Sequence, residues 1–290
     1  MLKKLAQNHL SRNAYLGLGV IALVLLPWLV GAGGGNYWVR VLDFALLYIV
    51  LALGLNVVVG FAGLLDLGYI AFYALGAYSY ALLASPHLPN HFEVIASAFP
   101  QGLHFSPWMV VIFSIILAAL FGIVLGLPTL QLRGDYLAIV TLGFGEIVRI
   151  LLLNNTEVTG GPNGISQIPK PTFFGLEFNR SLRDGGWDTF HHFFELKYDP
   201  SDRIVFLYLV ALLLVILTLF IINRLLRMPL GRAWEALRED EIAAEAMGLN
   251  KRNVKLLAFG MGASFAGIAG ALFSSYQGFI SPESFVLNES

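Results

Sequence analysis

The stretch 204–222 contains nineteen consecutive residues without a charge, IVFLYLVALLLVILTLFII. At about 1.5 Å per residue in a helix, this run is long enough to cross a hydrocarbon core of about 30 Å. Several other windows are also apolar on every side, whereas a helix of a soluble domain would be amphipathic. The composition agrees, with 57% hydrophobic and 13% charged residues. The sequence therefore predicts an all-α fold, a polytopic bundle of transmembrane helices.

Seven segments have the length of a membrane span, and together they predict one transmembrane domain over residues 1–290. The positive-inside rule orients them. Lys3, Lys4 and Arg12 precede the first span and predict a cytoplasmic amino terminus, whereas residues 85–106 contain no lysine or arginine. Seven basic residues between 224 and 255 fall on the predicted cytoplasmic side. The predicted spans are 15–30, 39–59, 64–84, 107–127, 136–153, 204–222 and 254–276.

The segment 54–76, GLNVVVGFAGLLDLGYIAFYALG, permits two interpretations. The link from Gly60 to Gly63 is short for a loop between two full spans. Its glycines also fit a broken or re-entrant helix, which a membrane protein tolerates where the backbone is buried in protein or lines a cavity. The pattern alone leaves both open.

The longest predicted loop, 154–202, lies on the external side. Its first part, NNTEVTGGPNGISQIPKP, is rich in Gly, Pro and Asn, which predicts ordered turns rather than helix. Ordered turns lose little entropy on binding, so contact with an external partner is favoured over a role as a spacer.

Several classes of chemistry lack a sequence signature. The sequence contains no GxxxxGK[ST], HExxH or GxSxG motif, and no cysteine. Its six histidines include no pair at a metal-binding spacing on one apolar helix. The net charge of −1 and the lack of a basic stripe do not indicate nucleic-acid binding. We therefore expect a protein that is not an enzyme and has no metal or nucleotide site of its own.

A few ionisable residues fall in or near the spans, where a charge costs at least about 2.5–3.5 kcal/mol. Glu146 and Arg149 are three residues apart, so they share a helix face and can pair. They either line a path for a substrate or fix helix packing as an internal pair, with snorkelling of Arg149 as a further option. We expect Asp43 to be solvated near the outer interface. The candidate residues of a translocation path are Asp66, Thr141, Glu146 and Arg149.

The segment 224–252 predicts a short amphipathic helix on the cytoplasmic side, over residues 231–250. Pro229 suits a helix start, and Gly248 suits the C-terminal cap. Such a helix either lies on lipid headgroups or contacts a partner protein, and its many acidic residues favour the protein. The candidate contact residues are Trp234, Glu241, Ala243, Ala244 and Gly248.

Three long runs resemble one known family. They are GLNVVVGFAGLLDLGYIAFYALGAY, LRGDYLAIVTLGFGEIVRILLLNNTEVTGGPNGI, and GRAWEALREDEIAAEAMGLN with the following VKLLAFGMGASFAGIAGALF. The chain resembles the LivM-type permease subunits of branched-chain amino-acid ABC importers. The third run is similar to the loop that docks on the ATPase, whose usual core is Glu-Ala-Ala, three residues, then Gly. Ala243, Ala244 and Gly248 match that core; Ile242 holds the Glu position, with Glu241 one residue earlier.

The resemblance implies a function and a set of partners. It implies translocation of branched-chain amino acids across the bacterial inner membrane by a multi-pass permease. It also implies a LivH-type second permease, two ABC ATPase subunits that bind ATP and magnesium in place of this chain, a periplasmic amino-acid-binding protein, and surrounding lipid. Similar permeases continue past the point corresponding to Ser290, so we expect a C-terminally truncated chain. The alternatives are an ion-coupled secondary transporter, with Asp66 and Glu146 titrating, and a non-transporting scaffold subunit.

Overall fold

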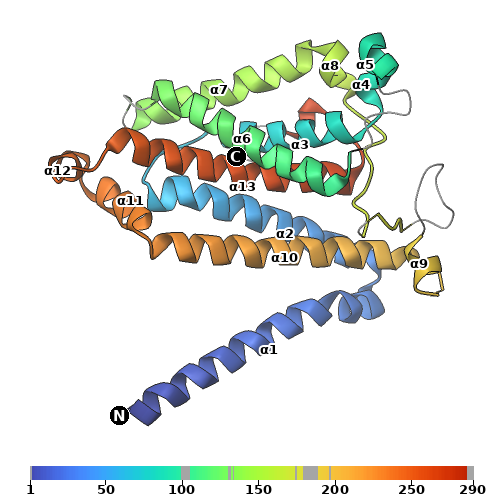
Figure 1. The fold of residues 1–290 in the computed structure, drawn as a ribbon, viewed down its shortest axis with the longest axis horizontal. Coiled ribbons are helices and arrows are strands. Elements are labelled where there is room, and N and C mark those ends of the chain that lie inside the picture. The colour runs from blue at the N-terminus through green and yellow to red at the C-terminus, as the bar shows by residue number, and fades with distance from the viewer. Residues whose placement is uncertain are drawn as a thin grey trace.

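The structure is a computed structural model that describes residues 2–98, 105–129, 132, 134–173, 175–178, 189–195 and 197–285, with side chains from residue 17 onward. The side chains of Lys3, Lys4 and Arg12, used to orient the chain, lie outside the described residues. Long helices run roughly side by side along one axis (Figure 1). The described part contains no β-strand, only isolated bridges, so the predicted all-α class is confirmed.

Within the described residues, six helices are long and apolar enough to cross a membrane. They agree closely with six of the seven predicted spans, because uncharged runs of this length leave few other conformations open in lipid. These helices are α1 (Leu2–Gly34), α2 (Asn36–Asn56), α6 (Pro107–Thr129), α7 (Asp135–Asn154), α10 (Pro200–Leu226) and α13 (Lys251–Gln277). The shorter ones are α3 (Ile70–Ala84), α4 (His87–His91), α5 (Glu93–Ala98), α8 (Thr156–Thr159), α9 (Phe190–Phe193), α11 (Pro229–Glu239) and α12 (Glu241–Ala246).

The helix in the predicted span 64–84 begins only at Ile70, which agrees with the broken-helix interpretation of 54–76. After α2 the chain forms one π-helical turn, Val57–Phe61, and then leaves the helix until α3 begins at Ile70. Gly63 in this interruption has a φ of +67°, and a side chain on Gly68 would collide with the backbone of Thr141. At about 1.5 Å per residue, α3 is only about 22 Å long. Most of it is buried in protein, where an interrupted backbone is tolerated.

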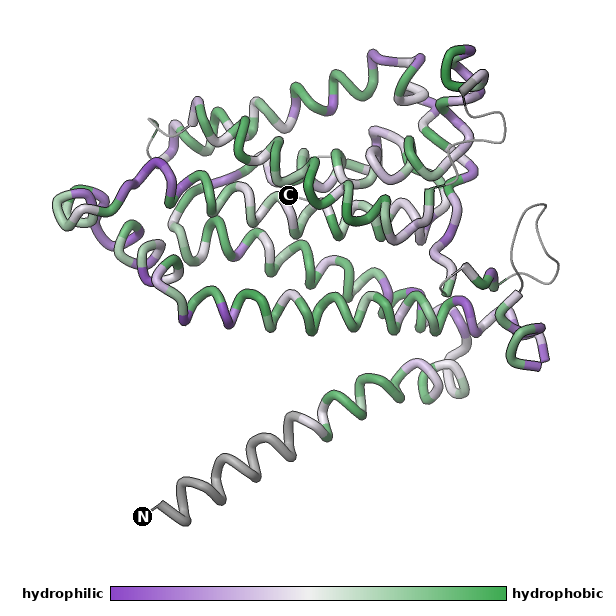
Figure 2. The backbone as a smooth tube through the Cα atoms, in the orientation of Figure 1, coloured by the Kyte–Doolittle hydropathy of each residue, from purple (hydrophilic) through white to green (hydrophobic). Residues whose placement is uncertain are grey.

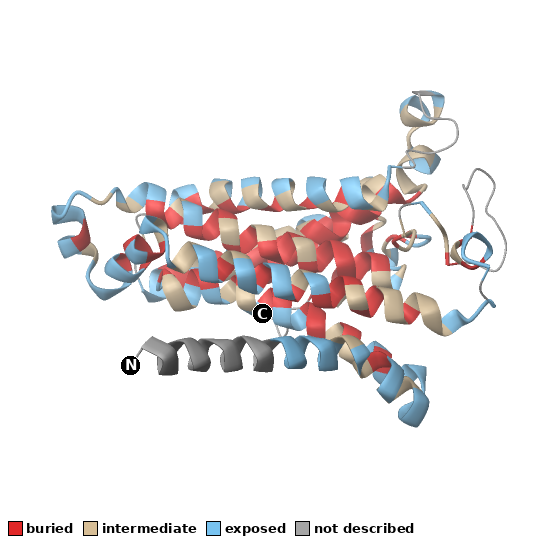
Figure 3. Ribbon diagram, turned by 60° about the horizontal axis from the view of Figure 1, so that its bottom comes forward, coloured by how far each residue is buried: buried red, intermediate tan, exposed pale blue. Residues whose placement is uncertain are grey.

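Helix α13 forms the centre of the bundle. It packs against α2, α3 and α6, and 72% of its apolar window is buried, compared with 28% for α6 and for α7. Small residues permit this close packing. A Cβ on Gly76 of α3 would lie 2.6 Å from the Cα of Gly267, and one on Gly122 of α6 would lie 2.6 Å from the Cβ of Ala263. Figure 3 shows the buried residues concentrated along these helices.

Helix α1 stands at an angle to the bundle (Figure 1), and only 6% of its apolar window is buried. The hydroxyl of Tyr208 on α10 donates a 3.0 Å hydrogen bond to the carbonyl of Leu23 on α1. The amino-terminal end of α1 points the same way as the α11–α12 end of the bundle (Figure 1).

The start of the 154–202 loop contains ordered turns, as predicted, but also a short helix, α8, where turns rather than helix were expected. One helical turn, α8, is followed by the 3₁₀ turn Gly161–Asn163, and Gly160 and Gly164 adopt positive φ. Ile165 then pairs with Ile280 through backbone hydrogen bonds of 2.8 and 3.0 Å. This pairing holds the loop against the segment that follows α13. Residues 174, 179–188 and 196 of the loop lie outside the described residues.

Candidate functional site

The predicted single helix over 231–250 is wrong, because it is two helices. The chain breaks at Asp240, which has an extended conformation with φ −153° and ψ 110°. The Asp240 carboxylate accepts hydrogen bonds from the backbone amides of Ile242 at 2.8 Å and Ala243 at 3.0 Å, and so caps α12. Since α11 ends at Glu239, α12 can point in a different direction, and it forms the tip of this end of the molecule (Figure 1).

Helix α11 is held to the bundle by Trp234. The indole Nε1 of Trp234 donates a 3.0 Å hydrogen bond to the carbonyl of Val254 in the first turn of α13, and the side chain is 1% exposed. Ala233 and Leu237 are buried beside it. Trp234, predicted as a contact residue for a partner, therefore has no exposed surface and anchors α11.

Two charged side chains link this pair of helices to the interior. The Nζ of Lys255 lies 2.8 Å from Glu241 Oε1, with the two side chains 6% and 18% exposed. The Arg238 guanidinium donates a 2.6 Å hydrogen bond to the carbonyl of Gly60 in the π-helical turn. Glu241 therefore faces α13. The family resemblance instead places Glu241 one residue before the acidic position of the loop that docks on the ATPase.

Apolar side chains are exposed on α12 and in the turn after it, beside the exposed Glu245–Lys251 ion pair. Ile242 is 69% exposed and Met247 is 85% exposed, and Ala243 and Gly248 are exposed with them. Of the two predicted contact alanines, Ala244 is buried. Gly248 ends the segment with φ +88° and open space around its Cα. The purple, hydrophilic stretches that flank this tip in Figure 2 identify it as a polar end of the molecule with a small apolar knob.

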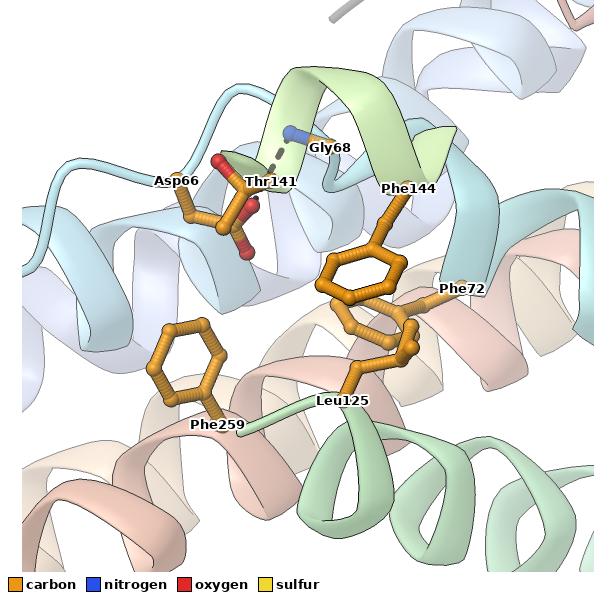
Figure 4. Close-up of a pocket in the computed structure, with 7 residues that line it drawn as sticks. All are labelled: Asp66, Gly68, Phe72, Leu125, Thr141, Phe144 and Phe259. Atoms are coloured by element: carbon orange, nitrogen blue, oxygen red, sulfur yellow. Dashed lines mark hydrogen bonds between the residues drawn. The ribbon is translucent and has the colours of Figure 1, made fainter. Parts of the chain in front are cut away.

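Asp66 and Thr141 meet inside the bundle. Asp66 is 4% exposed, and its Oδ1 accepts a 2.9 Å hydrogen bond from the Gly68 amide. The Thr141 hydroxyl accepts a 3.0 Å bond from the Leu67 amide and donates to the carbonyl of Ala138 at 3.1 Å. Figure 4 shows both side chains at a small pocket of about 10 Å³, room for about one water molecule. The other lining residues are Gly68, Phe72, Leu125, Phe144 and Phe259.

A larger cavity of about 210 Å³ lies on the α11–α12 side. One of its lining residues, Leu137, lies one helical turn before Thr141 on α7. Arg238, Glu241 and Lys255 supply its charged wall. Sequence reasoning missed this cavity and the roles of Arg238 and Lys255, since its wall is assembled from separate segments. The sequence contains one indication of this cavity, which is Lys255 within the otherwise apolar pattern of α13.

Glu146 and Arg149 lie away from both cavities. The Arg149 Nε donates to both Glu146 carboxylate oxygens at 3.0 and 3.1 Å, and Nη2 donates at 2.6 Å. The side chains are 43% and 32% exposed on the outer side of α7. The predicted pairing of these residues therefore forms, but the four candidate path residues separate into a buried pair and a surface pair.

The expectation for Asp43 is wrong. Its side chain is 1% exposed, and neither carboxylate oxygen has a hydrogen bond to a described residue. It is buried because α2 packs against both α10 and α13 at this level, which the sequence of α2 alone does not reveal. The hydroxyl of Tyr276 on α13 is its polar neighbour.

Residues 37–290 match the family model described as "Branched-chain amino acid transport system / permease component". The chain belongs to the branched-chain amino acid permease family. The family match begins at Tyr37 and so includes α2 to α13, both cavities and the α11–α12 tip, whereas α1 precedes it.

The chain is similar to two groups of permeases, with high sequence identity to one group and low sequence identity to the other. It is 61% identical to the LivM permease of Escherichia coli K12 and 62% identical to that of Salmonella typhimurium LT2, in each case over 98% of this chain and 62% of the relative. It is 25% identical to the LivH permease of Escherichia coli K12, over 81% of this chain and 68% of the relative. The chain thus spans about three fifths of the length of the LivM relatives. No solved structure matches it.

Proposed function

We propose that this chain is the permease subunit of an ABC importer and translocates branched-chain amino acids across the bacterial inner membrane. The observation that carries the proposal is the exposed apolar knob of α12, linked through Arg238 and the Glu241–Lys255 pair to the cavities along α7. The family match and the LivM relatives support the class of substrate.

ATP is handled outside this chain, by two ATPase subunits that bind it with magnesium. The knob of Ile242 and Met247 fits a hydrophobic groove on such a subunit, because exposed apolar side chains gain free energy when a partner covers them. Motion of that groove moves α12 directly. Since Arg238 holds the end of the second span, the same motion reaches the interrupted segment that carries Asp66.

The inner pocket has the chemistry of an amino-acid site. Phe72, Phe144 and Phe259 provide an apolar surface for a branched side chain, and Asp66 provides a carboxylate for its ammonium group. Oδ2 of Asp66 has no hydrogen bond to a described residue, so it is free to accept one. The present volume of about 10 Å³ excludes an amino acid, so the pocket must widen during transport.

The remaining parts of the machine are a LivH-type permease and a periplasmic amino-acid-binding protein that delivers the substrate. The basic residues at the α11–α12 end support a cytoplasmic position for that end. The amino-terminal end of α1 points the same way (Figure 1), which supports a cytoplasmic amino terminus.

The test is co-expression with the second permease and the ATPases, followed by affinity purification in mild detergent and by uptake assays in cells. We expect Met247→Asp and Gly248→Arg to lose ATPase from the complex, because each places a charge on the knob. Met228→Asp is the matched control, since Met228 is also exposed but precedes α11 and is not part of the knob. Normal ATPase recovery with the Met247→Asp and Gly248→Arg variants, or uptake that survives ATP depletion, contradicts the proposal.

A further inference from the structure

The outer face of α7 is exposed along its length. Its exposed residues recur about every fourth position and include Ile139, Gly143 and Ile147. Gly143 is the smallest of them, and nothing lies within 4 Å of the place where its Cβ would be. This face therefore has a notch at its centre that no part of the described chain fills.

The Glu146–Arg149 pair borders this notch at the depth of the membrane. Glu146 is the twelfth residue of α7, so it lies roughly 17 Å along a helix that rises about 1.5 Å per residue. Both side chains are partly exposed, and no other described residue bonds to them. Charged groups at this depth are costly against lipid and normally face protein or water.

The outer face of α6 provides the contrast. Its exposed residues Ile112, Ile116, Leu120 and Val124 are all apolar, and the helix has a mean hydropathy of 3.0, compared with 1.9 for α7. A face of this kind is suited to lipid. The two helices therefore present different surfaces, although equal fractions of them are buried.

We propose that the face of α7 centred on Gly143, Glu146 and Arg149 packs against a transmembrane helix of the LivH-type permease. The notch permits close approach of the partner backbone, as small residues do between membrane helices. The bonds to Glu146 use Nε and Nη2 of Arg149, so Nη1 is available to an acceptor on the partner. The partner helix presents a polar side chain at this depth.

The choice of partner rests on the proposed function and on the similarity of this chain to both LivM and LivH permeases. Two related folds can pair through corresponding faces, as in a pseudo-symmetric dimer. The inner side of α7 carries Leu137 and Thr141, which line the cavities. A partner on the outer side would therefore lie one helix away from the proposed path.

We would place a photoreactive benzoylphenylalanine at Ile147 of α7 or, as the matched control, at Ile116 of α6. Both residues are exposed isoleucines in spans. In the co-expressed complex, illumination should give an adduct with the LivH-type permease from position 147 and not from position 116. An adduct from 147 with a second copy of this chain, or none in an intact complex, overturns the inference.

A substitution provides an independent test. Gly143→Leu fills the notch without a clash inside this chain, and Gly19→Leu makes the same change on α1, also in open space. We expect Gly143→Leu to reduce recovery of the LivH-type permease at least fivefold and Gly19→Leu to leave it unchanged. Normal recovery of the LivH-type permease with Gly143→Leu would contradict the proposed interface but not the proposed function. Failure of the unmodified chain to recover either the second permease or the ATPases overturns the proposed function as well.

Discussion

The Arg238 guanidinium on α11 donates a hydrogen bond of 2.6 Å to the carbonyl oxygen of Gly60, in the π-helical turn that ends the second span. This bond joins the α11–α12 tip to the interruption between α2 and α3. Asp66 lies only six residues beyond Gly60, so a displacement of α11 is transmitted to the inner pocket over a short, partly buried path.

Arg238→Ala should uncouple the ATPases from transport. It removes the bond to Gly60 and leaves the apolar knob of α12 intact, so ATPase recovery should be normal while uptake falls about tenfold, within the usual range of coupling free energies. Arg232→Ala is the control, because Arg232 is an exposed arginine on the same helix. Uptake and ATPase recovery are measured side by side. Equal uptake by the two variants contradicts the role of the bond.

Glu241→Gln should destabilise the fold by about 3–5 kcal/mol, because it leaves the buried Lys255 ammonium without its charged partner. The double variant Glu241→Gln with Lys255→Met removes both charges and should recover much of the loss. Thermal unfolding in detergent measures Glu241→Gln, Lys255→Met and the double variant against the parent. Strictly additive losses would show that the two side chains do not interact.

The cap of α12 should weaken in acid. Hydrogen bonds from the amides of Ala243 and Ile242 lower the pKa of Asp240 from its ordinary value of 3.8. Its contribution to stability is therefore present above about pH 3.8 and is lost as the pH falls through the lower pKa of the folded state. Hydrogen-exchange protection of those two amides should fall in this range. Asp240→Asn, which caps without a charge, should remove the pH dependence.

Asp66→Asn should raise the amino-acid concentration needed for half-maximal uptake about tenfold or more, since a hydrogen bond to a charged group contributes about 1.5–3 kcal/mol. The amide oxygen of Asn can still accept the bond from Gly68, so the pocket should keep its shape. Asp43→Asn makes the same change at a buried carboxyl away from the cavities and should leave uptake unchanged. Loss of uptake in both variants would point to folding rather than recognition.

The sequence predicted the long helices well and the short polar segments less well. An uncharged run of membrane length has essentially one stable conformation in lipid, so the six long spans were found within a few residues. The split of 231–250 at Asp240 was missed, since an Asp inside a charged, helix-rich pattern is compatible with a continuous helix. Its capping bonds to Ile242 and Ala243 depend on the direction that α12 takes.

The positions of the ionisable side chains had to come from the tertiary structure. Periodicity identifies neighbours on one helix, so the pairing of Glu146 with Arg149 was within reach. Periodicity does not show which helices pack against one another, so the burial of Asp43 and Trp234 was not predicted.

By itself the sequence determined a membrane-spanning helical chain with a polar tip, because hydrophobicity and charge act locally along the chain. Only the tertiary structure decided that Asp66 and Thr141 share a pocket, that Lys255 is paired with Glu241, and that the charges of α7 face outward. These relationships join residues from different helices or depend on how the helices are rotated. They are set by packing around the small residues of α13, where backbones approach within contact distance.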